Sequence, residues 1–152
     1  MKKWLALWKY RTQRYFSAPL QTKYMLVEAA VLLGVSRAIV LLLPFRFFAP
    51  YLGQQSSETS HAPAAPQQQI ASRVMAMIDM VSPRTPWNSN CLAQAITGKL
   101  MLRSRGVPST LYMGLRNEAA ELKAHAWLRA GDMFVTGGVI ASQYKVVTFY
   151  GK

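Results

Sequence analysis

A change of hydrophobic period near Pro108 constrains the fold more than any other feature of the sequence. Before this point apolar side chains recur at helical spacing, over 70–81 and again over 91–106. After it apolar and polar side chains alternate, as in the run that contains Leu111 and Met113, which is the period of a half-buried strand. Helices therefore precede a small antiparallel sheet, and the sequence predicts an α+β fold.

The alternating half predicts a hairpin and one further strand. Residues 124–130 and 133–136 are extended segments on either side of Gly131 and Asp132, a dipeptide typical of hairpin loops. Residues 144–150 complete the predicted sheet.

The stretch 24–48 is apolar enough to resemble a membrane span. Glu28 and Arg37 interrupt it, however, and Pro44 breaks it. No run of about 18 uncharged apolar residues remains, so we expect a buried or membrane-apposed helix near 22–43.

Composition divides the chain into three parts. Residues 54–69 are polar and rich in Ser, Ala, Pro and Gln, which is typical of a linker. They separate a basic helical segment at 1–53 from residues 70–152, which hold the candidate catalytic groups. A chain of 152 residues is sized for one compact domain with an appended segment, so we expect a single catalytic core at 70–152.

The charge balance favours an anionic partner, because the formal net charge is +12. The first 23 residues carry Lys and Arg interleaved with aromatic residues and no acid, a composition of membrane-surface or docking segments. No nucleic-acid-binding motif is recognisable. One cysteine excludes an internal disulfide and a multi-cysteine metal site, and no secretory signal is evident. We therefore expect a cytoplasmic protein without metal or cofactor, in peripheral contact with an anionic membrane at most.

Cys91 is the only thiol, and Asn88, Ser89 and Asn90 before it offer side chains that cap helix N-termini. At such a position the unpaired backbone amides and the helix dipole favour a thiolate, which is a nucleophile. The alternative is that Cys91 is a small buried hydrophobic residue.

A thiolate protease also needs a base within hydrogen-bond reach. Of the two histidines, His61 lies in the predicted linker, where nothing would hold its ring. His125 lies 34 residues after Cys91, on a strand predicted to pack against the helix and on the same face as Trp127. A core or surface histidine without a catalytic role is the alternative.

Four short segments occur in an informative order: Cys91-Leu92-Ala93-Gln94-Ala95, Leu102-Arg103-Ser104-Arg105-Gly106-Val107, Met113-Gly114-Leu115 and Ala124-His125-Ala126-Trp127. Together they resemble the core of lasso-peptide leader peptidases, members of the transglutaminase-like, papain-related superfamily. Leu43-Pro44-Phe45-Arg46 and Leu52-Gly53 resemble the N-terminal helical segment of that family.

The resemblance implies that Cys91 is the nucleophile and His125 the general base. The implied reaction is hydrolysis of one peptide bond in a precursor peptide, which releases the core peptide to a separate ATP-dependent lasso cyclase. Such peptidases also rely on a leader-recognition domain. No such module fits before residue 70, so we expect a stand-alone peptidase that acts with a separate leader-recognition protein.

The family triad ends in an acid, and Asp132 is the only acid after His125. A straight strand puts Asp132 roughly 20 Å from His125. The same register pairs Trp127 with Thr136 and His125 with Gly138. Asp132 is therefore either the orienting acid or a turn residue, and the alternative acceptors are Thr136 and a carbonyl of Gly137-Gly138.

The oxyanion of the tetrahedral intermediate needs hydrogen-bond donors. We expect the Cys91 amide to be one, and Trp87, Asn88 or Asn90 to supply another. These three are equally explained as helix caps and loop packing, and capping is favoured for Asn90.

Two other functions remain open from the sequence. The same Cys-His pair supports an acyltransferase of the transglutaminase type, because both reactions pass through a thioester. Alternatively, the chain is a non-enzymatic basic adaptor that binds a membrane or a peptide through its N-terminus, with Cys91 buried.

Overall fold

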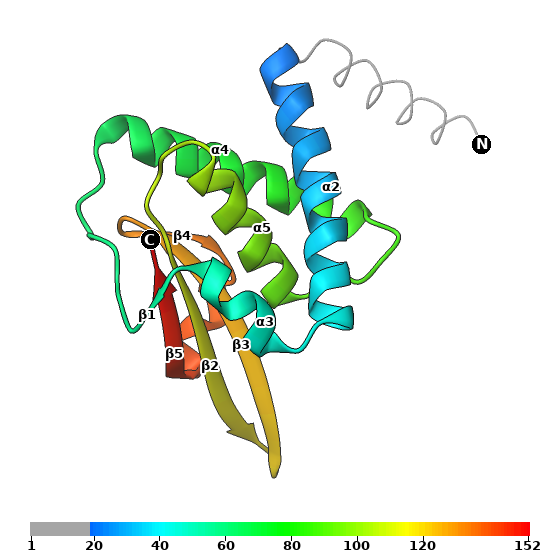
Figure 1. The fold of residues 1–152 in the computed structure, drawn as a ribbon, viewed down its shortest axis with the longest axis vertical. Helices are drawn as coiled ribbons and strands as arrows, with labels where there is room; N and C mark the ends of the chain where they lie inside the picture. Colours follow the sequence, from blue (N-terminus) through cyan, green and yellow to red (C-terminus); the bar gives the residue numbers. More distant parts are fainter. Residues whose placement is uncertain (1–18) are drawn as a thin grey trace.

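The computed structural model describes residues 19–152 and places the three long helices before strands β2 to β5 along the chain (Figure 1). The long helices are α2 (Leu20–Leu42), α4 (Ala65–Val81) and α5 (Cys91–Arg103). The strands are β1 (Gln54–Gln55), β2 (Thr110–Glu118), β3 (Glu121–Ala130), β4 (Met133–Thr136) and β5 (Lys145–Gly151). Short helices are α3 (Phe45–Phe48), η1 (Ala49–Leu52), η2 (Ser82–Arg84) and η3 (Gly138–Gln143). The predicted α+β fold class is confirmed.

The strands form one sheet in the order β1-β5-β2-β3-β4, and every neighbouring pair is antiparallel. The main core lies between this sheet and the helices, with buried side chains from both layers: Val74, Ile78, Ile96, Met101, Leu102, Leu111, Leu128 and Val135. Gly98 brings α5 close to the sheet, since a Cβ there would lie 2.7 Å from Leu128 Cδ2.

A second, smaller cluster lies on the other face of the sheet. Tyr112 and Trp127 are directly opposite each other on β2 and β3, and their rings stack at 5.6 Å between centroids. Ala141 of η3 packs on them. Side chains of α5 belong to the main core, whereas η3 contributes to this second cluster. The sheet therefore separates two sets of side chains.

The predicted helices and strands occur, with shifted ends. The helix expected near 22–43 begins at Leu20 and ends at Leu42, before Pro44. The helix expected over 70–81 begins earlier, at Ala65, because Pro66 suits a first turn and Gln67 Oε1 accepts from the Ala64 amide at 3.3 Å. The helix that begins at Cys91 ends at Arg103, and a turn follows.

The polar segment predicted as a linker is attached to the sheet. Gln54 and Gln55 pair with the end of β5. Further along, the Thr59 amide and hydroxyl both lie 2.9 Å from Thr110 Oγ1. These contacts join residues far apart in sequence, so composition could not reveal them. The division of the chain at 54–69 stays a prediction.

α2 is the one helix among residues 19–152 that is long and apolar enough to cross a membrane, judged by length and composition. One side of it is joined to the helical layer, where Glu28 forms an ion pair with Arg105 at 2.5 Å and Ser36 Oγ accepts from Thr97 at 3.1 Å. The basic aromatic segment predicted at 1–23 lies mostly outside the described residues.

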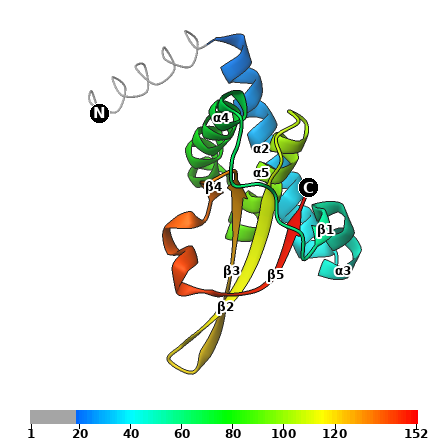
Figure 2. The same ribbon diagram turned by 90° about the vertical axis from the view of Figure 1, so that its left-hand side faces the viewer.

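The β2–β3 hairpin extends beyond the rest of the sheet (Figure 2) and ends in an unfavourable turn. Ala119 and Ala120, its two loop residues, both have positive φ, 50° and 69°. Such a turn favours Asn-Gly.

We expect the Ala119→Asn, Ala120→Gly double variant to raise the free energy of unfolding by about 1 kcal/mol, measured by urea denaturation. Ala76→Gly, on the exposed side of α4, is the control and should lower it.

Lys99 is a buried cation without an acidic partner in the part of the chain described. Its Nζ donates to the carbonyls of Ser109 at 2.7 Å and Tyr150 at 3.1 Å. Burial, followed by the nearby charge of Arg103, lowers the pKa of Lys99 from 10.5 to about 8. Between these two values the unfolded chain binds the extra proton.

Stability should therefore rise with pH across this window, by up to about 3 kcal/mol from this residue. Lys99→Met is expected to remove this rise. The rise is measured as the difference between the urea midpoint at neutral pH and the urea midpoint at about pH 10. Lys145→Met, at an exposed position, should preserve it. An unchanged pH dependence in Lys99→Met would show that Lys99 titrates normally.

Candidate active site

Cys91 is the first residue of α5 and is half-buried. Asn90 caps this helix, because its Oδ1 accepts a hydrogen bond from the Ala93 amide at 2.9 Å. The first turn of α5 contains no acidic residue. The thiol therefore lies where backbone N–H groups favour negative charge.

The loop before Cys91 is held by its own polar groups. Gln94 Nε2 donates to the Ser89 carbonyl at 2.7 Å, and Thr85 Oγ1 lies 2.9 Å from Ser89 Oγ. Trp87 lies beside α2, where a Cβ on Gly34 would be 3.1 Å from its ring.

The three proposed oxyanion donors thus differ in their surroundings. Asn90 uses its oxygen as a cap, Trp87 packs beside α2, and Asn88 is exposed. The backbone amide of Cys91 belongs to the same residue as the thiol, so it remains the first candidate for the oxyanion donor.

His125 lies in the middle of β3 and is 9% exposed. Its Nε2 is 2.8 Å from the Gly137 carbonyl oxygen. In the tautomer that makes this hydrogen bond, Nε2 carries the proton and Nδ1 is left as an acceptor. The ring also lies against Trp127 and Tyr144, at 5.8 Å and 5.0 Å between centroids. The imidazole is thus oriented by one carbonyl and two aromatic rings.

Gly137 is suited to this role because it has no side chain. Its φ is +69°, and a Cβ would lie 2.6 Å from the Ala126 carbonyl oxygen and 3.0 Å from His125 Nε2. Another residue would collide with the strand and with the imidazole. Glycine therefore permits the carbonyl to approach the ring.

Asp132 is exposed and lies in the turn between β3 and β4. Thr136 pairs with Leu128, and its hydroxyl is buried without a hydrogen-bond partner. Within residues 19–152 neither side chain has a hydrogen bond to His125. The expected pairing of Trp127 with Thr136 is wrong by one residue, because the register shifts at an irregularity between Leu128 and Arg129.

Cys91 and His125 lie at the same level of the packed layers. α5 and β3 run in broadly the same direction, because a short turn leads from α5 into β2, which is antiparallel to β3. Gly98 of α5 lies over Leu128. Cys91 is seven residues before Gly98, and His125 is three residues before Leu128. Both steps correspond to about 10 Å, at the rise of a helix and of a strand respectively.

Their side chains nevertheless have different neighbours. Cys91 packs against the core between the helices and the sheet. His125 shares its strand face with Trp127, whose ring belongs to the cluster on the opposite side. In the described part of the chain no hydrogen bond joins the thiol to the imidazole. The structure brings the two residues to one level without joining them.

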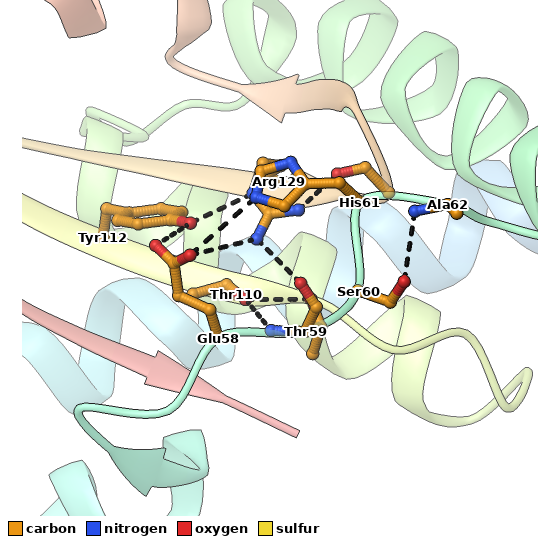
Figure 3. Close-up of polar contacts among 9 residues, drawn as sticks. Glu58, Thr59, Ser60, His61, Ala62, Thr110, Tyr112 and Arg129 are labelled. Carbon is orange, nitrogen blue, oxygen red and sulfur yellow. Dashed lines mark hydrogen bonds and ion pairs between the residues drawn. The ribbon is translucent and has the colours of Figure 1, made fainter.

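A buried arginine supports the aromatic cluster next to His125, and Figure 3 shows its contacts with Tyr112 and Thr59. Arg129, 4% exposed, donates from Nε to Tyr112 OH at 3.0 Å and from Nη2 to the Thr59 carbonyl at 3.0 Å. The Tyr112 hydroxyl donates to Glu58 at 2.7 Å. Burial, followed by the hydrogen bond to Glu58, raises the pKa of Tyr112. This network joins the segment before α4 to the ring that stacks on Trp127.

Sequence reasoning missed Arg129 and Glu58. The available signal was strand alternation, which puts Arg129 on the same face as His125 and Trp127 and demands an acceptor for a buried cation. The partner, Glu58, lay in the segment interpreted as a linker. Residues 19–152 contain no group of three or more His, Cys, Asp or Glu side chains that could hold a metal ion.

The fold and the site define a class: an α+β domain with a cysteine at the start of a helix that packs on an antiparallel sheet bearing a histidine. The model of the transglutaminase-like superfamily matches residues 39–148, a range that includes both Cys91 and His125. The chain therefore belongs to the transglutaminase-like superfamily. This domain indicates activity of the cysteine-protease or transglutaminase type. Comparison with curated proteins and with solved structures gave no match.

Gly137→Ala should disturb His125 through direct collision, and Gly106→Ala is a matched control. Both glycines have positive φ, +69° and +67°, but a Cβ on Gly106 meets nothing within 4 Å. Gly106→Ala should lower the free energy of unfolding by about 1 kcal/mol from backbone strain alone. Gly137→Ala should lower it by roughly 2–4 kcal/mol and shift the His125 ring resonances in NMR spectra. Equal effects of the two variants would refute the role of Gly137.

Proposed function

We propose that this chain is a cysteine endopeptidase that removes the leader from a lasso-peptide precursor. The observation that carries the proposal is the pair of oriented groups: Cys91 at the start of α5, and His125 held through Nε2 so that Nδ1 is an acceptor. Membership in the transglutaminase-like superfamily supports thiol chemistry. The order of the segments around Cys91 and His125 supports the leader peptidase among the activities of that superfamily.

The proposed reaction begins when His125 Nδ1 accepts the thiol proton. The thiolate attacks the carbonyl carbon of the scissile bond, and the Cys91 amide helps to stabilise the oxyanion. The imidazolium then gives its proton to the leaving amine, and water hydrolyses the thioester. The core peptide leaves as the amine product and the leader as the acid.

The two groups must come within hydrogen-bond distance for this reaction. Their shared level on α5 and β3 supports such an approach.

The proposed orienting group is a neutral carbonyl rather than Asp132. An acceptor is sufficient to select the tautomer and hold the ring, although it stabilises the imidazolium less than a carboxylate does. We propose that Gly137 fills this position, and that Asp132 is a turn residue.

The proposed partners are a precursor peptide, a separate leader-recognition protein and a lasso cyclase. The excess of basic residues supports contact with acidic segments of such partners. Transfer of the same acyl group to an amine is the competing outcome, and the products distinguish it.

Incubation of the protein with a precursor peptide and its recognition protein should yield leader and core whose masses sum to the precursor plus one water. Cys91→Ala should abolish cleavage, and His125→Gln should slow it by about 10²–10⁴-fold, because the general base is lost. His61→Gln, which changes the other histidine, should cleave normally. An amine-linked product without hydrolysis would establish an acyltransferase instead.

The rate at which Cys91 is alkylated tests its pairing with His125 without knowledge of the precursor. If Cys91 and His125 meet, iodoacetamide should modify Cys91 at about pH 6, where an isolated thiol reacts slowly. His125→Gln should lose this reactivity and His61→Gln should keep it. Slow modification of all three proteins would contradict the pairing of Cys91 with His125.

A further inference from the structure

The exposed face of α2 is apolar along its whole length. The exposed positions on one line of this helix are spaced by three or four residues, so they lie on a single face, and none is charged: Leu20, Tyr24, Val27, Val31, Val35, Ala38 and Leu42. Valines in the middle of this line are about half exposed, at 54%, 57% and 46%. A helix face that meets water normally carries polar residues. We call this surface the α2 stripe.

The apolar surface continues beyond the end of α2. Leu43, Phe47 and Tyr51 are 47%, 55% and 75% exposed. The Arg46 guanidinium lies over the Phe47 ring, 4.9 Å from its centroid. Aromatic rings beside a cation suit the boundary between lipid and water, where one side of the group is apolar and the other is wet.

Cations outnumber acids on α2 and α3. Lys23, Arg37 and Arg46 are the cations of this region, and Glu28, the only acid of α2, is neutralised by Arg105. By sequence, the 18 residues before the described part add five Lys or Arg and no acid. Pairing of two copies through this stripe would bring cations together in either orientation. A bilayer with anionic headgroups matches both the apolar stripe and the cations.

The opposite side of α2 determines how it could meet a bilayer. Met25, Ala29, Leu33 and Ser36 are buried. Ser36 accepts from Thr97 of α5, and Glu28 is joined to Arg105. Crossing the membrane would remove these contacts, whereas lying in the plane of the interface preserves them. α2 can therefore meet lipid on one side while α4 and α5 pack on the other.

We propose that the chain attaches peripherally to anionic membranes through the α2 stripe, with α2 parallel to the bilayer surface. This attachment is independent of the proposed peptidase activity. It would hold the domain at the membrane by apolar insertion along one helix face, reinforced by attraction between the surrounding cations and the headgroups.

The test is co-sedimentation of the full chain with vesicles, either of phosphatidylglycerol mixed with phosphatidylcholine or of phosphatidylcholine alone. The wild-type chain should bind the anionic vesicles much more tightly. The triple variant Val27→Gln, Val31→Gln, Val35→Gln should bind at least about tenfold more weakly, because three inserted apolar side chains are lost.

A second triple variant is the matched control. Val139, Val146 and Val147 lie outside the helical layer and are 97%, 42% and 56% exposed. Val139→Gln, Val146→Gln, Val147→Gln makes the same chemical change and should retain wild-type vesicle binding. Circular dichroism melting of both variants shows whether the fold is retained. Because all the changes are at exposed positions, both should melt close to the wild type.

Three outcomes would overturn the proposal. The wild-type chain could fail to bind anionic vesicles. Both triple variants could bind like the wild type, so that the α2 stripe contributes nothing. Light scattering could show a dimer that only the α2 triple variant loses, which would assign the stripe to a second copy of the chain. Loss of peptide cleavage with intact vesicle binding would instead count against the peptidase alone.

Discussion

The close packing of α5 on β3 is the contact on which the rest of the structure depends. It occurs at Gly98, where the absence of a side chain lets the helix rest directly on Leu128. Because the helix and the strand run in broadly the same direction, this contact fixes how far along the sheet each residue of α5 lies. Cys91 at the start of the helix is therefore at about the same height as His125 in the middle of β3. It also completes the main core, because Ile96 and Leu102 of α5 join the buried side chains of the sheet.

The two faces of the sheet have separate tasks. The face toward the helices is aliphatic and supplies most of the buried apolar surface, which is the main stabilising term. The opposite face carries His125, Trp127 and Tyr112, and the Trp127 ring stacks on both of the other rings. This face is held by specific polar contacts, from the Gly137 carbonyl at one end to Arg129 at the other. Orientation of the imidazole thus depends on hydrogen bonds and ring packing more than on bulk burial.

Three of the six acidic residues of this basic chain form ion pairs within the fold. Glu28 neutralises Arg105, and Glu58 contacts Arg129 and the Tyr112 hydroxyl. Glu118 pairs with Lys123 at the end of the β2–β3 hairpin. Acids that are paired inside the molecule do not screen the cations that face outward. The remaining cations therefore give the surface a positive potential, which attracts anionic surfaces.

The sequence by itself determined the fold class, the start of the helix at Cys91 and the hairpin at Gly131-Asp132, because these depend on local period, capping and turn chemistry. It also singled out Cys91 and His125, since each is scarce in the chain. Only the tertiary structure decided which carbonyl meets His125, because the strand irregularity after Leu128 shifts the register by one residue. The partnership of Glu58 with Arg129, and the exposure of the apolar line on α2, likewise depend on which surfaces the packed elements cover. Local patterns carry no information about such long-range contacts, so these features could be seen only once the chain was folded.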